Sequence, residues 1–467
     1  MNHLLLATTI AFAAGCSFDP GMASVNKDMS AGGGDLAGIT DMTPAGTDLT
    51  MVCTPGDSTC AAGMLSVCNA DGTGFDTSTC EIGCNTAGVA CLALQPTAPA
   101  VAGDFVYAGL KEPTIAASQT LLVFDVDSGE IKDGGGASVR MPNADPMARN
   151  VENGIGFHVA SGVGVWTFAK LTLPATATIV FKHSAAAAGA AILSATDLTI
   201  AGTIDARGYT DPTQALMATS TLCTGTVAGP GGTIGASGAT AATGTGAGGS
   251  SDVTAGGGGG GYGAAGGIGG NHGGTPGGIA GTTAGAAAIN PLLAGFGGGC
   301  SGTAGTTNGG GGGGGGALQL AAEGTITVSG GINAGGCGGA AGAAAHGGGG
   351  GGSGGAILIE APTVHVTATG ILAANGGGGG AGGDAASTAG TPGKTSEDPA
   401  SGGMTGSAGG AGGALGAEAG LPGTGGNGAG GGGGGVGRVR LNSKSGAALD
   451  TNSTVSPAAT QATVVLQ

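Results

Sequence analysis

The chain has 467 residues, of which 114 are glycine, while 9% are charged and 3% are aromatic. This composition excludes a single densely packed globular core. The 40% of apolar residues, which cluster in short alternating runs, also exclude ordinary disorder, which combines low hydrophobicity with many charges. The net charge of -16 argues against a nucleic-acid partner, because phosphate contacts need clustered Lys and Arg.

The chain begins with an apolar run from Leu4 to Ala14, which is too short to span a bilayer and has the length of a signal-peptide core. Small residues then lead into Cys16, and the ending FAAGC resembles the lipobox of bacterial lipoproteins. This resemblance implies a signal peptide over 1–15 and lipid on Cys16. Because Ser17 follows the cysteine, it also implies an outer-membrane lipoprotein, facing the cell surface or the periplasm. The alternative is a plain secretory signal that is cleaved nearby.

Residues 16–51 are small and polar and have no hydrophobic period, so we expect the lipid anchor to continue into a flexible tether. Its Asp-Met and Asp-Leu pairs resemble the tethers of glycine-rich surface lipoproteins of myxobacteria.

Residues 52–94 are expected to form a small disulfide-rich module. An exported segment this short cannot bury enough apolar area to hold itself together, so a dense, even set of cysteines predicts three bridges, with fifteen possible pairings. A metal site is disfavoured, because the segment has no CxxC pair and no histidine. The cysteines are Cys53, Cys60, Cys68, Cys80, Cys84 and Cys91.

Residues 101–467 carry a strand pattern that repeats at 191–208, 317–336 and 356–377, with a degraded copy at 437–455. Each copy has three short strands with tight corners, and one copy cannot bury its own apolar face, so we expect the copies to stack. The pattern resembles the right-handed parallel β-helix of the pectin-lyase type, which implies an all-β fold filled by aliphatic ladders. The expected ladders are Ile192–Leu318–Ile357, Leu198–Ile326–Val364, Ile200–Val328–Val366 and Ile204–Ile332–Ile371.

Long glycine-rich insertions separate the copies, at about 209–316, 337–355 and 376–436. The entropy of loop closure grows only logarithmically with length, so the insertions can be loops on one side of the helix. Two alternatives remain open for them: they stay mobile, or they pack as extended polyglycine helices. Cys223 with Cys300 is one expected clamp and leaves Cys337 single; a pair that involves Cys337 is the alternative.

No constellation amounts to an active site, and we predict no catalytic residue, no metal site and no cofactor. Lyases and hydrolases on this coil need converging carboxylates. The first copy has only Asp205 with Arg207, interpreted as a corner Asp that bonds local backbone and a solvated Arg. Asp125, Asp127 and Glu130 lack the spacing of an EF-hand and are interpreted as a turn between strands.

Trp166 and Phe168 are expected to face one side of a strand, in a core or cap, with a carbohydrate-stacking platform as the alternative. The sequence predicts a cell-surface lipoprotein with a structural or adhesive role, not an enzyme. Its expected partners are the membrane, through the lipid anchor, and extracellular polysaccharide or other envelope components. The alternatives are a weak or degenerate polysaccharide lyase or hydrolase and an adhesin built on a polyglycine bundle.

Overall fold

The structure is a computed structural model that describes residues 51–80, 82–184, 186–208, 223, 227–238, 240–302 and 309–467. The chain divides into two compact units, Met1–Met51 and Val52–Gln467. The predicted signal peptide, Cys16 and nearly all of the predicted tether lie outside the described residues. The second unit is nearly all-β, as predicted, and its described helix is the short 3-10 turn η1 (Ala102–Asp104). In the described part of the chain, no helix has the length and apolar character needed for a membrane span.

The cysteine module is a small antiparallel sheet made of β1 (Ser58–Ala61), β2 (Met64–Cys68) and β3 (Phe75–Thr79). Every residue of β3 is exposed, so the sheet has almost no apolar interior of its own. Three disulfides take the place of a core: Cys53–Cys68, Cys60–Cys84 and Cys80–Cys91.

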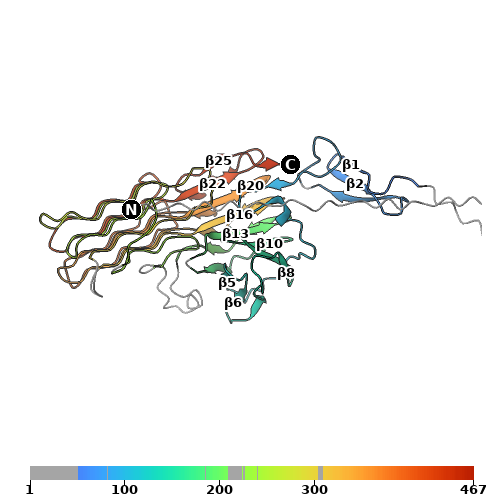
Figure 1. The fold of residues 1–467 in the computed structure, drawn as a ribbon. Helices are drawn as coiled ribbons and strands as arrows, with labels where there is room; N and C mark the ends of the chain where they lie inside the picture. The colour runs from blue at the N-terminus through green and yellow to red at the C-terminus, as the bar shows by residue number, and fades with distance from the viewer. Residues whose placement is uncertain are drawn as a thin grey trace, which may run out of the picture. The chain divides into compact units, whose positions relative to one another are not determined.

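Beyond the module, the chain visits three sheets in turn, and each visit to all three makes one coil (Figure 1). The first sheet contains β8 (Asn150–Glu152), β9 (Ile155–Ala160), β10 (Val163–Phe168), β13 (Gly189–Ser194), β16 (Ala317–Ala322), β19 (Ala356–Glu360), β22 (Arg438–Asn442) and β25 (Thr460–Ala462). The second contains β11 (Leu171–Leu173), β14 (Leu198–Ile200), β17 (Thr325–Val328), β20 (Thr363–Val366) and β23 (Ala448–Leu449). The third contains β5 (Leu121–Asp125), β6 (Ile131–Asp133), β7 (Ser138–Arg140), β12 (Thr178–Lys182), β15 (Thr203–Asp205), β18 (Gly331–Asn333), β21 (Ile371–Ala373) and β24 (Thr454–Ser456).

Equivalent strands of successive coils pair in parallel, and each of the four predicted repeats supplies one coil. At the first coil, the hairpin strands β8 and β9 and the strands β6 and β7 pair antiparallel with the sheets. They extend two of the three sheets beyond the parallel strands, so β8 and β7 are the edge strands there. The body is therefore a β-helix-like stack of parallel coils with antiparallel strands at its first end.

Aliphatic ladders fill the interior of the coils, as expected. Each side chain that is fully buried in such a ladder contributes roughly 1.5–3 kcal/mol relative to exposure. The confirmed neighbours, each at most 1% exposed, are Leu198–Ile326–Val364, Ile200–Val328–Val366, Leu318–Ile357 and Ile204–Ile332.

Two expected ladder contacts are wrong. Ile192 lies opposite Leu320 and not opposite Leu318. Both leucines of β16 face inward, so the pattern alone does not choose between registers that differ by two residues. Leu372 continues the fourth ladder and is fully buried, whereas Ile371 is half-buried. Because side chains alternate along a strand, an error of one residue changes the face of the sheet.

An aromatic cluster fills the first coil. Trp166 is fully buried, and its ring centroid lies 5.1 Å from that of Phe124 and 5.0 Å from that of Phe157. Phe168 is 1% exposed and belongs to the same core. Trp166 and Phe168 are therefore core residues, as expected, and the carbohydrate-stacking alternative is wrong for both.

A linking segment runs from the module along the outer side of the first sheet. Its strand β4 (Leu94–Gln95) pairs with β26 (Val465–Leu466), the last strand of the chain. Further on, the backbone N–H and the hydroxyl of Thr97 donate to the carboxylate of Glu360 at 3.0 and 2.7 Å. Gln319 and Asn442 also donate to this buried carboxylate, at 2.8 and 3.0 Å. These hydrogen bonds satisfy Glu360 and fix the linking segment to the coils.

Candidate functional site

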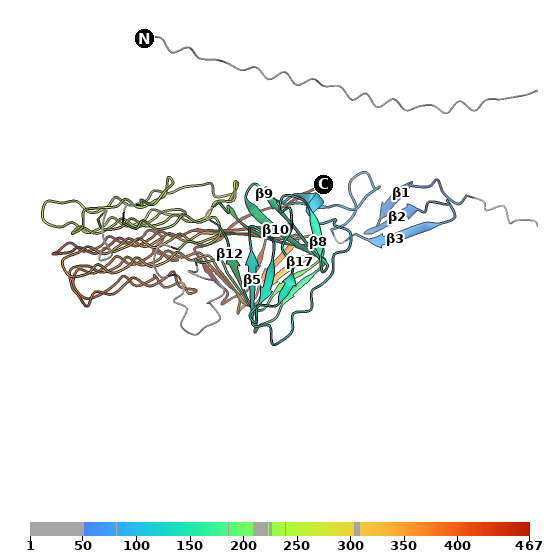
Figure 2. The same ribbon diagram turned by 60° about the horizontal axis from the view of Figure 1, so that its bottom comes forward.

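The glycine-rich insertions all leave the coils at one corner, between the third sheet and the first. They connect β15 to β16, β18 to β19 and β21 to β22. Figures 1 and 2 show them as long excursions that run out from the coils side by side. We call the described residues of 206–316, 334–355 and 374–437 the glycine bundle.

The hydrogen bonds of the bundle repeat every three residues. Along 256–261, each amide donates to the same neighbouring segment as the amide three residues before it. Gly256 and Gly259 donate to Gly270 and Gly267 of one segment. Gly257 and Gly260 donate to Gly348 and Gly351 of a second, and Gly258 and Gly261 donate to Gly249 and Gly246 of a third. A three-residue period without internal bonds is that of an extended threefold helix.

The helix 256–261 also accepts hydrogen bonds from three further segments. Its carbonyls receive the amides of Gly278 and Gly281, of Gly432 and Gly435, and of Gly299. This helix is therefore surrounded by six hydrogen-bonded neighbours, and the segments 347–355 and 430–437 are enclosed in the same way. Backbone hydrogen bonds therefore connect each of these three segments to all six of its neighbours.

Glycine is required here by the packing. A Cβ atom added at Gly350 would lie 2.0 Å from the carbonyl oxygen of Gly258, and one at Gly431 would lie 2.0 Å from that of Gly349. Real Cβ contacts essentially never fall below 3.0 Å. For the described residues, packing as polyglycine helices is thus the confirmed alternative, and mobile loops are wrong.

One exposed side of the bundle consists of the segments 265–271, 277–282 and 420–424, which we call the terrace. Its segments are neighbours, because Gly269 donates to the Gly278 carbonyl at 2.9 Å and Gly423 to that of Ile268 at 3.0 Å. Ile268, Ile279 and Leu421 are 53%, 74% and 54% exposed. These three exposed apolar side chains lie on adjacent segments, and clustered apolar side chains mark interaction sites more often than scattered ones do.

The cysteines of the insertions pair differently from the first expectation. Cys223 is bridged to Cys337, with their Cα atoms 4.8 Å apart, and Cys300 is a buried free thiol. The Cys300 sulfur lies 3.3 Å from the hydroxyl of Ser250 and 3.1 Å from the carbonyl of Gly302. The predicted Cys223–Cys300 bridge is therefore wrong, and the alternative that involves Cys337 is confirmed. Cys337 is at the start of the second insertion, which leaves the coils at the same corner as the first insertion, where Cys223 is found.

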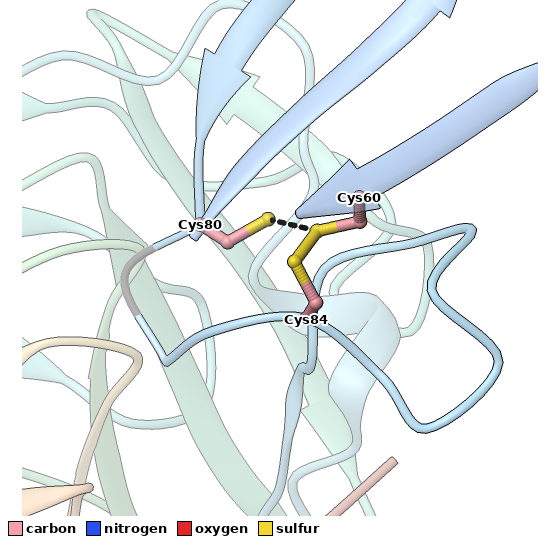
Figure 3. A group of neighbouring side chains, drawn as sticks. All are labelled: Cys60, Cys80 and Cys84. Carbon is pink, nitrogen blue, oxygen red and sulfur yellow. Dashed lines mark hydrogen bonds between the residues drawn. A yellow bond between two sulfur atoms is a disulfide. The ribbon is translucent and has the colours of Figure 1, made fainter. Parts of the chain in front are cut away.

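The module brings three sulfurs together as a geometric candidate for a metal site. Figure 3 shows Cys60, Cys80 and Cys84, with the sulfurs of Cys60 and Cys80 3.3 Å apart. The sulfurs of Cys60 and Cys84 are bonded to each other, and that of Cys80 is bonded to Cys91. A metal ligand must be a thiolate, so this cluster is two neighbouring disulfides.

Asp205 and Arg207 form a tight ion pair at the end of β15. The Nε atom of Arg207 donates to both carboxylate oxygens at 2.9 and 3.1 Å, and its backbone N–H donates to the same carboxylate. The side chains are 6% and 15% exposed, so the expected solvated Arg207 is wrong. A guanidinium that is paired in this way is satisfied by its own corner.

The acidic residues of FDVDSGE point to separate partners in the turn between β5 and β6. Asp125 accepts from Lys182 at 2.8 Å, Asp127 accepts from the hydroxyl of Ser184, and Glu130 pairs with a neighbouring lysine. The hydrogen bond to Asp125 raises the pKa of Lys182. The predicted turn is confirmed, and its carboxylates do not converge on one point.

Sequence reasoning missed a buried polar group beside the first coil. Asp104, which is fully buried, lies 2.6 Å from Arg149 and 3.6 Å from the Nε2 atom of His158, whose Nδ1 atom is 2.9 Å from the Tyr107 hydroxyl. Burial lowers the pKa of His158 and raises that of Tyr107. The only sequence signal for this group was Asp104, an acid in an otherwise apolar stretch. The contact between Asp104 and His158 joins η1 to β9.

Comparison with known protein families, with curated proteins and with solved structures finds no match.

Proposed function

We propose that this chain is a cell-surface lipoprotein with a structural or adhesive role, whose glycine bundle contacts extracellular polysaccharide or another repetitive envelope component. The supporting observation is the terrace, whose segments are joined by backbone hydrogen bonds and expose three apolar side chains, Ile268, Ile279 and Leu421, which we call the apolar row. The segments of the terrace read AGGIGGN, GGIAGT and GLPGT and carry no charged residue. Such a surface suits a neutral, hydroxylated polymer better than it suits a charged one.

Polar side chains flank the apolar row. Asn271, Thr282 and Thr424 are exposed on the same three segments. A polymer with alternating apolar and hydroxyl groups can therefore lay its apolar face on the row and hydrogen-bond to the flanks. Many weak contacts of this kind add up when both surfaces are repetitive.

The coils support the rest of the proposal. We propose that they wind in the right-handed sense of the pectin-lyase type, because connections between parallel strands of one sheet are right-handed in about 98% of cases. The lipid anchor on Cys16 and its outer-membrane location belong to the same proposal and rest on the FAAGC ending. Replacing Cys16 by Ala should abolish metabolic lipid labelling and release the protein from membranes, and unchanged labelling would refute the anchor.

Retention of the full chain on immobilised polysaccharides tests the contact. The variant with Ile268, Ile279 and Leu421 all replaced by Ser removes the apolar row and adds no bulk to the packed lattice. Its matched control is Ile234→Ser, because Ile234 is 46% exposed but lies outside the terrace. Retention should fall in the triple variant and persist in the control. Equal loss in both variants contradicts a role of the terrace.

A further inference from the structure

A hollow of about 130 Å³ opens between the glycine bundle and the coils. Its wall includes Gly263, Ala287 and Glu418, which lie just beyond the ends of the three terrace segments, and Arg438 and Thr460 from β22 and β25. Gly263 and Glu418 are two residues from the start of their terrace segments, so one extended polymer can contact both the terrace and the hollow. Ligand pockets usually measure about 300–1,000 Å³, so this hollow suits one residue of a polymer.

Arg438 is the cation of this hollow. It stands at the head of β22, in register with Ala356 of the coil before and, through it, with Ala317. Its NH2 group donates to the carbonyls of Ala284 and Gly285 at 3.0 and 3.3 Å. These neutral acceptors orient the guanidinium without neutralising its charge, and Glu418 lines the same hollow.

Two buried polar atoms next to the hollow have no hydrogen-bond partner among the described residues: the Nε atom of Arg438 and the hydroxyl of Tyr262, which does not line the hollow. The guanidinium carbon lies 5.4 Å from the centre of the Tyr262 ring, and Tyr262 is fully buried. Within the described chain, no carboxylate lies within ion-pair distance of Arg438. A guanidinium held in a fixed orientation without an anion is a ready binding group for one.

We infer that the hollow binds the carboxylate of a single acidic sugar residue, a uronate, within an otherwise neutral polysaccharide that lies along the terrace. This inference rests on the proposed function and names the class of its ligand. Arg438 takes the carboxylate, while Glu418 and Thr460 can accept hydrogen bonds from the sugar hydroxyls. Glu418 also disfavours a dianion such as phosphate, because a like charge in the same wall repels it more strongly than it repels a monoanion.

Isothermal titration of the full chain in detergent, at an ionic strength of 0.15 M, tests the inference. The probes are glucuronate, the neutral sugar glucose and inorganic phosphate. Arg438→Gln should weaken glucuronate binding about 10-fold or more, since a hydrogen bond to a charged group contributes about 1.5–3 kcal/mol. Arg438→Lys keeps the charge but loses the planar arrangement of donors, so its affinity for glucuronate should lie between those of the unmodified chain and Arg438→Gln.

The matched control is Arg440→Gln on the same strand. The Nε atom of Arg440 already donates to Asn442 at 2.8 Å, and Arg440 does not line the hollow. Unchanged glucuronate binding in Arg438→Gln, tighter binding of phosphate than of glucuronate, or equal binding of glucose would each overturn the inference. A thermal melt of each variant shows that it is folded.

The outcome separates this inference from the proposed function. Retention of neutral polysaccharides on the terrace should not change in Arg438→Gln. If no polysaccharide is retained but glucuronate binding depends on Arg438, the inference about the hollow is supported and the proposed adhesive role is contradicted. If polysaccharides are retained but glucuronate does not bind, the adhesive role stands and the inference is overturned.

Discussion

Adding one methyl group inside the glycine bundle should strongly lower the free energy of unfolding, whereas adding one at its surface should raise it slightly. In Gly350→Ala, the new Cβ would lie 2.0 Å from the Gly258 carbonyl oxygen, so the two helices must move apart by about 1 Å. Two bonds join them near this point, Gly257 to Gly348 and Gly260 to Gly351, both 2.9 Å long. Lengthened to about 3.9 Å, they are no longer hydrogen bonds.

The expected cost follows from those two bonds. Each lost bond leaves a buried amide without an acceptor, which costs about 1–3 kcal/mol, so the loss of both bonds should lower the free energy of unfolding by at least about 2–6 kcal/mol. Gly274→Ala is the control, because a Cβ there would meet nothing within 4 Å. At such a position Ala stabilises by about 0.4–1 kcal/mol, through the lower entropy of the unfolded chain.

Denaturant unfolding of both variants, together with hydrogen exchange of the bundle amides, provides the assay. Gly350→Ala should shift the unfolding midpoint down and speed exchange along 347–355, while Gly274→Ala should do neither. Equal midpoints and equal exchange in the two variants would refute the packed lattice, since a mobile tract tolerates Ala at either position.

Three further predictions concern charge and covalent structure. Burial raises the pKa of Glu323, so the stability linked to this group is present at low pH and is lost as pH rises through the folded pKa; Glu323→Gln should raise the melting temperature at pH 7 more than at pH 4. Burial lowers the pKa of His158, so the stability linked to this group is present above the ordinary pKa of 6.5 and is lost as pH falls below it. His158→Gln should therefore reduce the difference between the melting temperatures at pH 7.5 and pH 5.5. An unchanged difference would show that His158 does not cause the pH dependence. Cys223→Ser opens a bridge with a sequence separation of 114 and should lower the free energy of unfolding by up to about 5 kcal/mol in denaturant titrations, whereas an unchanged midpoint means that the bridge does not form.

The coils were predictable because their signal is local. Alternating aliphatic residues with tight corners specify which face of each short strand is buried, and stacking follows because one copy cannot bury that face. The register was less secure: β21 has three residues, and two adjacent apolar residues, Ile371 and Leu372, competed for one inward position. Only the neighbouring coil decides between them.

The bundle and the hollow depend on contacts that the sequence does not encode locally. A run of glycine fits a mobile loop and a polyglycine helix equally well, and six neighbours from distant segments decide the matter. The disulfide partner of Cys223 could not be predicted for the same reason, because it depends on which insertion lies beside Cys223 in the folded chain. Arg438 sits in the most degraded repeat, where an Arg replaces the Ala of earlier coils, so its hollow becomes visible only once the coils and the bundle are assembled.

We propose that the bundle holds a polymer at the cell surface without cutting it. Retention of the full chain on a panel of immobilised polysaccharides, with newly released sugar ends assayed in the same samples, tests this most directly. We predict retention that depends on the apolar row of the terrace, with no new sugar ends. Release of sugar fragments, or retention that is unchanged when the row is removed, contradicts the claim.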